Sequence, residues 1–364
     1  MRIFIPDEDK TWILSKFSEI LDSRILTNGK FCSELEKELA KYLGVKHVLA
    51  TNSGTGALEA MIRAQGLNGK ILVTPETFAA TIYAIQRSGC QPVFADIGRD
   101  MSLDPDHVAK KIAKDTAAIM TVHIGGHVSS GVWKLKDLAD QHDLPLLEDS
   151  AHAIGSKIDD SFAGTIGTSS GFSFFPTKVM GSAEGGFVST NDSEIAEKVT
   201  VLRDQGKKVG NLCVEKGYNW RMSEFQAVIA LAQLQRLEEF IRRRSEIARQ
   251  YSQFLQANKL HNKIREYSVP KGARPNWYKF IVFLNGVERD RLKAKLKANS
   301  IEMSGEVYEV PCHTQPVFED LGYKQGDFPV TEDVCASHVC FPLMANLTDA
   351  QVQYFCDKLA ESLA

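Results

Sequence analysis

The chain has 364 residues, 43% of them hydrophobic, so it can bury a large core and is long enough for roughly two domains. Its 43 basic and 46 acidic residues leave a formal net charge of −3, which gives no support for a nucleic-acid or anionic-membrane partner. No apolar run approaches the ~18 residues of a membrane helix, and the early acidic residues 7–9 are unlike a signal peptide. Seven cysteines without a repeating spacing favour reduced thiols and a cytoplasmic location.

Short apolar segments alternate with helical ones through the first part of the chain. Strands are expected at residues 48–51, 71–74, 92–95, 118–122 and 145–147, with helices such as 57–63 and 135–142 between them. Alternating strands and helices predict an α/β fold with a mainly parallel sheet. Because the strands are continuously apolar, we expect helices to cover both faces of this sheet.

A long helical segment, residues 223–256, is rich in Ala, Leu, Gln, Glu and Arg and predicts one or two helices. Its charged middle, residues 234–249, suits a connection between two domains. A strand at 278–284 and helices at 289–299 and 348–363 follow and predict a smaller α/β domain. We therefore divide the chain near residue 245, into domains 1–245 (with an N-terminal helical segment) and 246–364.

A loop rich in glycine and hydroxyl groups, residues 51–58, follows the first expected strand. Gly54 and Thr55 lie where this loop meets the next helix. Free backbone N–H groups and hydroxyls at a helix N-terminus suit a phosphate. Ordinary helix capping explains the same residue types equally well.

Phe78 lies just after the second expected strand, in the segment 75–81. An aromatic side chain at such a position can stack on a flat heterocycle. Packing in the core is the commoner explanation for a single phenylalanine, so Phe78 becomes informative only together with the other segments.

Two carboxylates, Glu148 and Asp149, end the apolar strand near residue 147. Ligands of open α/β sheets bind at the carboxyl ends of strands, and an aspartate there can keep a pyridine nitrogen protonated. Adjacent strand residues point to opposite faces, so the two cannot form the opposed pair of a glycosidase. Asp149 could instead cap the next turn. His152 either bonds a ring substituent or is a satisfied buried histidine.

Lys178 lies in a segment, residues 171–186, that flanks it with glycine, serine, proline and aromatic residues. No charged residue lies within five positions on either side, whereas surface lysines usually belong to charge runs. Glycine loosens the backbone and Pro176 stiffens it. A held, partly desolvated amine has a lowered pKa and can form a Schiff base, so this lysine is the candidate catalytic residue.

Two other kinds of site, for zinc and for a nicotinamide cofactor, fit the sequence less well. The residues Cys312, His313, Cys335, His338 and Cys340 are of zinc-ligand types, but their spacing is not a common finger pattern, and we predict no metal. A nicotinamide oxidoreductase would share the fold class, but the sequence has no G-x-G-x-x-G after the first expected strand. Together, the four segments above instead provide what binding of pyridoxal phosphate (PLP) requires. They offer a phosphate-binding loop, an aromatic ring to stack on the cofactor, a carboxylate for the ring nitrogen and an amine for the aldehyde.

Nearly the whole chain resembles the DegT/DnrJ/EryC1/StrS group of sugar aminotransferases, within the PLP-dependent enzymes of fold type I. The matching segments are residues 52–55, 77–78, 92–96, 148–152, 172–174 with Lys178, 184–186, 217–224, 326–329 and 341–343. The resemblance implies the PLP-dependent transferase (aspartate aminotransferase-like) fold. Its large domain has a mainly parallel seven-stranded sheet between helices, and a smaller C-terminal α/β domain follows.

The resemblance also implies a role for each candidate residue. Lys178 would form the Schiff base with PLP, Asp149 would pair with the pyridine nitrogen, and His152 would lie near the ring hydroxyl. Phe78 would stack on the ring. The phosphate would be held by Gly54, Thr55 and Ser173, and by Asn219 of the other subunit. The implied assembly is a homodimer with shared active sites.

The implied reaction moves an amino group from L-glutamate, with glutamine as the alternative, to a keto sugar linked to a nucleotide. A 3- or 4-keto-6-deoxyhexose is expected, for an amino sugar of a surface polysaccharide or natural product, with pyridoxamine phosphate as the intermediate form of the cofactor. The alternatives are an aminotransferase for a cyclitol or another cyclic ketone, a PLP-dependent sugar dehydratase and a PLP-binding sensor without turnover. Lys178 argues against the dehydratases, because those relatives have histidine there.

Two stretches depart from the family pattern. Residues 125–130 replace a Tyr-Gly-Gln-type stretch, and residues 181–183 replace a Thr/Gly-rich run. Both are expected near the substrate, so the identity of the sugar is left open.

Overall fold

A seven-stranded sheet forms the centre of the computed structural model, which describes residues 3–363. Its strands lie in the order β1-β9-β8-β5-β4-β2-β3. Their bounds are β1 His47–Thr51, β2 Lys70–Val73, β3 Gln91–Phe94, β4 Thr116–Val122, β5 Leu146–Asp149, β8 Ser169–Ser173 and β9 Gly186–Thr190. β9 runs antiparallel to both neighbours, and the pairs from β8 to β3 are parallel. The expected α/β fold with a mainly parallel seven-stranded sheet is confirmed.

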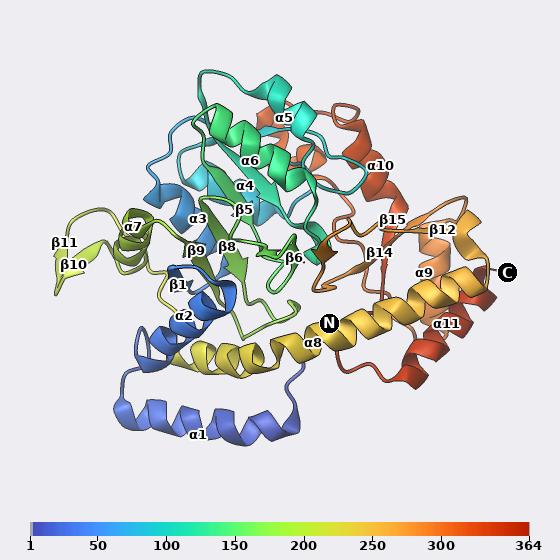
Figure 1. Cartoon of the computed structure of the whole chain (residues 1–364), viewed down its shortest axis with the longest axis horizontal. Coiled ribbons are helices and arrows are strands. Elements are labelled where there is room, and N and C mark those ends of the chain that lie inside the picture. The colour runs from blue at the N-terminus through green and yellow to red at the C-terminus, as the bar shows by residue number, and fades with distance from the viewer. Residues whose placement is uncertain (1–2, 364) are drawn as a thin grey trace.

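Helices cover the sheet on both faces (Figure 1). These helices are α3 Gly54–Ala64, α4 Ala79–Arg87, α5 Pro105–Lys111, α6 Gly131–Gln141 and α7 Ser193–Arg203. Two further helices, α1 Asp7–Ser23 and α2 Lys30–Leu43, come before them in the chain. Neighbouring strand residues belong to different cores: Ile71 packs with residues of α3 and α4, whereas Leu72 packs with residues of α5 and α6. This two-sided burial is the reason that the strands read as continuous apolar runs.

The C-terminal part of the chain adds a three-stranded antiparallel sheet in the order β12-β14-β15. Its elements are β12 Ile264–Glu266, β14 Phe280–Leu284, β15 His338–Phe341, α9 Arg289–Ala298, α10 Pro329–Ser337 and α11 Asp349–Leu363. Short strands complete the structure: β6 Lys157–Ile158, β7 Ser161–Phe162 and β13 Ala273–Arg274 form one small sheet, and β10 Lys207–Val209 and β11 Leu212–Cys213 form a hairpin. Turns of 3-10 helix lie at Ile124–Gly126, Leu260–Asn262, Cys312–Thr314 and Pro316–Leu321.

One continuous helix, α8 (Glu224–Ala257), joins the two parts of the chain (Figure 1). It begins with a capping box of Ser223 and Gln226. Its first half packs against α1 and α2, and its second half shares a core with the C-terminal sheet and α11. Residue 245 lies inside this helix, and the division of the chain there stays a prediction. No helix within residues 3–363 is long and apolar enough to cross a membrane.

The segment 171–186 differs from the loop that we expected. Its first residues belong to β8 and its last to β9. The sequence pattern does not predict β8, because the strand consists mainly of Ser and Gly, which are poor strand formers. Small residues are required there: a Cβ on Gly171 would lie 2.7 Å from Leu58 of α3. Lys178 is therefore on a hairpin connection between two core strands.

A buried carboxylate, that of Glu224, ties the start of α8 to the start of α2. Glu224 Oε1 accepts hydrogen bonds from the backbone N–H groups of Gly29 (2.9 Å) and Cys32 (3.0 Å), and Oε2 accepts one from Phe31 (2.8 Å). The N-cap of α2 is Gly29, which has no side chain to do this. Glu224 therefore supplies the cap from another helix, with favourable charge at the helix N-terminus.

We expect Glu224→Ala to lower the free energy of unfolding by about 2–4 kcal/mol, because it leaves two buried N–H groups and a half-buried one without an acceptor. Urea unfolding of the cofactor-free protein measures the change. Glu34→Ala, on the exposed face of α2, is the matched control and should shift stability by no more than about 0.5 kcal/mol. Equal unfolding midpoints for the two variants would contradict the capping role.

Candidate active site

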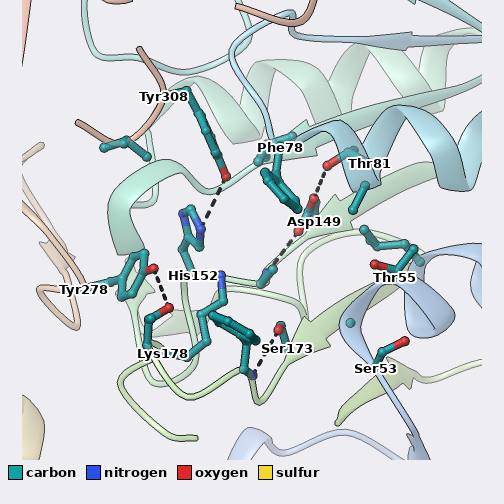
Figure 2. Close-up of a pocket in the computed structure, with 18 of the residues that line it drawn as sticks. Ser53, Thr55, Phe78, Thr81, Asp149, His152, Ser173, Lys178, Tyr278 and Tyr308 are labelled. Atoms are coloured by element: carbon teal, nitrogen blue, oxygen red, sulfur yellow. Dashed lines mark hydrogen bonds between the residues drawn. The ribbon is translucent and has the colours of Figure 1, made fainter. Parts of the chain in front are cut away.

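The carboxyl ends of the parallel strands meet at a cavity of about 420 Å³ (Figure 2). Ser173 ends β8, Asp149 ends β5 and Val122 ends β4, and all three line the cavity. Seven of the eight predicted site residues are brought together there: Gly54, Thr55, Phe78, Asp149, His152, Ser173 and Lys178. The eighth, Asn219, is not among the lining residues.

The N-terminus of α3 faces the cavity next to the end of β8. Ser53 caps the helix through Gly56 N–H (3.0 Å), while the N–H groups of Gly54 and Thr55 have no partner within residues 3–363. A Cβ on Gly54 would lie 2.7 Å from the Cβ of Ser173, so only glycine allows this close approach. The free N–H groups and the hydroxyls of Thr55 and Ser173 form a cradle that suits a phosphate.

Asp149 and Glu148 point to opposite faces of β5, as the strand geometry predicted. Glu148 is fully buried away from the cavity and accepts hydrogen bonds from Gly164 (2.8 Å), Ile166 (2.8 Å) and His123 (2.8 Å). Glu148 therefore holds a loop behind the sheet, and Asp149 alone of the pair lines the cavity.

The carboxylate of Asp149 is positioned by two donors. Its Oδ2 accepts from Thr81 Oγ1 at 2.7 Å and its Oδ1 from Ala151 N–H at 3.1 Å. Thr81 is supported in turn by Thr77, whose Oγ1 lies 2.7 Å from Thr81 Oγ1. Burial raises the pKa of Asp149, whereas the Thr81 hydrogen bond and the nearby Lys178 charge lower it. Asp149 forms no ion pair with any residue from 3 to 363, and such a buried carboxylate suits a protonated ring nitrogen.

Lys178 lies on the β8–β9 connection, anchored on one side by the buried Val179 and Met180. Its backbone N–H donates to Phe175 O at 2.9 Å, which closes a tight turn. Its side chain extends into the cavity (Figure 2). Burial lowers the pKa of the amine from 10.5 to about 8, Asp149 opposes the shift, and the charge of Lys279 adds to it. The amine is thus tuned toward neutrality, as nucleophilic lysines require.

His152 stands on the other side of the cavity and is held neutral. Its Nδ1 accepts from Gly125 N–H at 3.3 Å, which places the ring proton on Nε2, 3.4 Å from the Tyr308 hydroxyl (Figure 2). Burial lowers the pKa of His152 well below 6.5. Nε2–H is therefore available as a hydrogen-bond donor to a ligand oxygen.

Part of the cavity wall comes from the C-terminal part of the chain, which the sequence did not connect to the site. Tyr278 contacts the His152 ring, with centroids 4.4 Å apart, and Thr177 Oγ1 lies 3.1 Å from the Tyr278 hydroxyl. Tyr308 stacks near Phe78 at 6.3 Å and 21°. Phe78 itself is 61% exposed, so it is no core residue, and one of its faces is open to a ligand.

Asn219 is exposed and lies near the β10–β11 hairpin, where its backbone carbonyl accepts from Asn52 Nδ2 at 2.9 Å. The departing stretches give no side chain to the cavity either. Gly125 supports His152 from behind, as described above. Ser182 donates its N–H to Phe174 O and its hydroxyl to Gln226 O, so it braces the Lys178 connection.

The cysteine and histidine cluster of the C-terminal part has ordinary protein partners. His313 Nε2 pairs with Glu332 at 2.9 Å, His338 Nε2 accepts from Val307 N–H at 2.9 Å, and Cys312 Sγ donates to Thr77 O. Within residues 3–363, no group of three or more His, Cys, Asp or Glu side chains is arranged to hold a metal ion.

The architecture is that of the transferases of PLP fold type I. The chain superposes with a TM-score of 0.91 on the crystal structure of DesV from S. venezuelae, solved in complex with a ketimine intermediate. The two chains are 29% identical, and the match covers 99% of this chain and 98% of DesV.

Residues 7–360 match the model of the DegT/DnrJ/EryC1/StrS aminotransferase family, and the chain belongs to that family of PLP-dependent sugar aminotransferases. Among curated relatives, it is 33% identical to GDP-perosamine synthase of Vibrio cholerae, over 92% of this chain and 91% of that protein. It is 32% identical to the "Pleiotropic regulatory protein" of Geobacillus stearothermophilus, over 97% and 94% of the two chains.

The lowered pKa of Lys178 predicts a pH-dependent stability in the cofactor-free protein. Below pH 8 the amine is charged both folded and unfolded, so its burial penalty is fully present. Between about 8 and 10.5 the folded protein releases the proton first, and the penalty disappears. The stability advantage of Lys178→Met over wild type should therefore shrink by up to about 3 kcal/mol across this window. Urea unfolding of both proteins at several pH values tests it, and a constant difference would show that the pKa is ordinary.

Proposed function

We propose that the chain transfers the amino group of L-glutamate to the keto group of a nucleotide-linked sugar, a 3- or 4-keto-6-deoxyhexose. The observation that carries the proposal is one cavity that unites Lys178, Asp149 and the free N-terminus of α3. Family membership and the names of the relatives, GDP-perosamine synthase among them, support a sugar acceptor.

The cavity fits PLP on its own geometry. The unpartnered N–H groups of Gly54 and Thr55 suit the phosphate, and the Gly54–Ser173 approach leaves room for it. Asp149, which has no ion-pair partner in the described part of the chain, suits the ring nitrogen, Phe78 the ring face and His152 the ring hydroxyl. When bound, PLP supplies an aldehyde for the Schiff base with Lys178 and an electron sink for the charge that develops on the substrate carbon.

Lys178 is also the proton carrier of the proposed reaction. With PLP bound and the amino acid in place of Lys178, Nζ would be a free amine able to take the proton from the α-carbon of glutamate. In the second half-reaction the same nitrogen gives a proton to the sugar carbon that becomes aminated. A base works best when its pKa is near the working pH, and the pKa of about 8 meets this condition.

Asp149 and His152 act through fixed charge and hydrogen bonding rather than proton transfer. Asp149, held by Thr81 and Ala151, would keep the nitrogen of a bound ring cationic. His152 cannot donate from Nδ1, so it presents one N–H in one direction. Losing the Asp149 carboxylate should therefore slow proton transfer more than it weakens substrate binding.

We expect the PLP-loaded protein to show a visible Schiff-base band that L-glutamate bleaches, and to aminate a nucleotide-linked keto-deoxyhexose. Lys178→Ala should lose the band and at least about 10³-fold in rate, because both nucleophile and base are removed. Lys157→Ala, on a short strand that does not line the cavity, is the control. Absorbance and product mass report the outcome. A band that survives in Lys178→Ala would refute the Schiff-base assignment.

The same experiment separates a second candidate function, a PLP-binding regulator without turnover. The 32% identity to a protein called a pleiotropic regulatory protein supports this second candidate. A regulator would show the band but no bleaching by glutamate or glutamine and no aminated sugar. A keto cyclitol in place of the keto sugar distinguishes the remaining aminotransferase alternative.

We also propose a homodimer whose sites are shared through Asn219. Support comes from apolar side chains that are exposed on the hairpin β10–β11, where Val209 is 73% and Leu212 63% exposed. The hairpin projects from the body of the chain beside α7 (Figure 1), and Asn219 lies exposed close to its base. Apolar patches of this kind mark protein interfaces, and a twofold dimer would bring each hairpin to its partner.

Subunit mixing tests the shared site. Asn219→Ala should weaken PLP binding about tenfold through loss of a hydrogen bond to phosphate, and Lys178→Ala is inactive. In a mixed dimer, one site would combine the wild-type Lys178 of one subunit with the wild-type Asn219 of the other. At limiting PLP, an equal mixture should then recover about a quarter of the wild-type activity. If Asn219 serves its own chain, or the protein stays monomeric by sedimentation, no recovery above the separate proteins will occur.

A further inference from the structure

A second lysine, Lys279, lines the same cavity immediately before β14. It is 6% exposed, and its Nζ donates to Ser304 O at 2.7 Å. The Tyr278 ring lies near both amines: its centroid is 5.4 Å from Lys279 Nζ and 5.1 Å from Lys178 Nζ. Both amines line the one cavity, and the charge of Lys279 lowers the pKa of Lys178, so the second amine is near enough to act on the reacting one.

The charge of Lys279 has no acidic partner. No carboxylate within residues 3–363 forms an ion pair with it, and the nearby Glu306 is already paired with Arg289 (3.3 Å) and Lys293 (3.0 Å). Buried lysines are almost always paired with an opposite charge. An ammonium group has three donors, and the carbonyl of Ser304 takes one of them. Two donors are left for a ligand, and the Glu306 carboxylate, which attracts the charge of Lys279, is shared with two other cations.

The backbone of Lys279 is held on both sides by the loop that departs from the family pattern. Lys279 N–H donates to Gly125 O at 3.0 Å, and His127 Nε2 lies 3.3 Å from Lys279 O. Because Nε2 faces a carbonyl, it carries the ring proton. The His127 ring lies against Tyr267, with centroids 4.2 Å apart, and meets Trp277 edge to face. The loop thus positions a cation rather than contacting the ligand.

The lining residues restrict which anion this cation can meet. Lys178 and Lys279 are the two basic side chains among the described residues that line the cavity, apart from the neutral His152. Lys178 is committed to the Schiff base, so Lys279 is left to compensate a substrate charge. An amino acid carries its α-carboxylate on the reacting carbon itself. The phosphates of a nucleotide sugar are several bonds from the reacting carbonyl, so nearness to Lys178 favours the amino acid.

We propose that Lys279 binds the α-carboxylate of the amino-acid donor, with His127 as the residue that positions it. The assignment rests on the proposed aminotransferase function. It gives the departing stretch at 125–130 a role in donor recognition and leaves the identity of the sugar to other parts of the cavity.

Single-turnover kinetics of the PLP-loaded protein test the proposal. L-Glutamate and L-glutamine share the α-carboxylate and differ in the side-chain carboxylate. We expect Lys279→Met to raise the half-saturating concentration of both roughly 10- to 100-fold, as for loss of a charged hydrogen bond. Lys279→Arg keeps the charge and should recover most of the loss. Lys295→Met is the matched control, since Lys295 Nζ also donates to a carbonyl at 2.7 Å, that of Ser362, but on the exposed surface.

Equilibrium binding of 2-methylglutamate gives a readout without turnover, because its α-carbon has no proton to lose. The ratio of 2-methylglutamate affinities between wild type and Lys279→Met should match the ratio of half-saturating glutamate concentrations from the single-turnover experiment. His127→Phe keeps an aromatic ring but loses the N–H donor, so it should raise the half-saturating concentration several-fold at an unchanged limiting rate. His127→Gln, which restores an N–H donor, should reverse this effect.

Other outcomes overturn the assignment in recognisable ways. An effect on glutamate but not glutamine would move Lys279 to the side-chain carboxylate. If the half-saturating concentration of the amino-acid donor stays within about threefold of wild type and only the sugar half-reaction loses rate, Lys279 binds the acceptor instead. A wild-type protein that binds PLP but neither reacts with nor binds an amino acid would refute the proposed function itself, and the donor site with it.

Discussion

The structure depends on holding one amine out of water beside one carboxylate. Lys178 and Asp149 come from different strand ends, and each would be unfavourable if it were buried alone. The antiparallel strand β9 makes the arrangement possible, because it pairs with β8 and keeps Lys178 on the connection between the two strands, residues 174–185. Val179 and Met180 then bury the connection in the core between the sheet and α8.

The neighbours Glu148 and Asp149 show how one strand divides structure from chemistry. Both side chains are buried, yet Glu148 is satisfied by backbone N–H groups of the 164–167 loop and by His123, while Asp149 has two donors and, within residues 3–363, no cation at ion-pair distance. The first arrangement stabilises a carboxylate fully. The second leaves a carboxylate that a cationic ligand group can still stabilise. Because neighbouring residues of β5 point to opposite faces, Glu148 stabilises the fold while Asp149 lines the cavity.

The sequence predicted the parts of the site that follow strand ends, because those side chains are local to the motif that carries them. Asp149 and Gly54 were proposed in this way, Lys178 was proposed from the uncharged glycine, proline and aromatic residues around it, and the structure brings all three to one cavity. The five expected strands agree with the structure to within two residues. Thr81 was within reach of the same reasoning, since it lies one helical turn after Thr77. Tyr278 and Tyr308 were not, because they reach the cavity through the packing of the C-terminal part on the sheet. That packing leaves no periodic pattern near the motifs. The strand β8 was missed because close contact with α3 requires small residues there.

The C-terminal part therefore does more than cover the cavity. Strand β14 places alternate residues in two cores: Ile281 and Phe283 pack with the sheet-side core, and Phe280 and Val282 pack with α11. The buried amide of Asn276 donates to His152 O and Ile154 O and accepts from Tyr278 N–H, which locks the start of this strand to the loop that follows β5. A rigid link of this kind fixes Lys279 relative to His152 and Lys178. Because recognition of a small carboxylate requires positions held to within a fraction of an ångström, a donor site is better built on this locked strand than on an exposed loop.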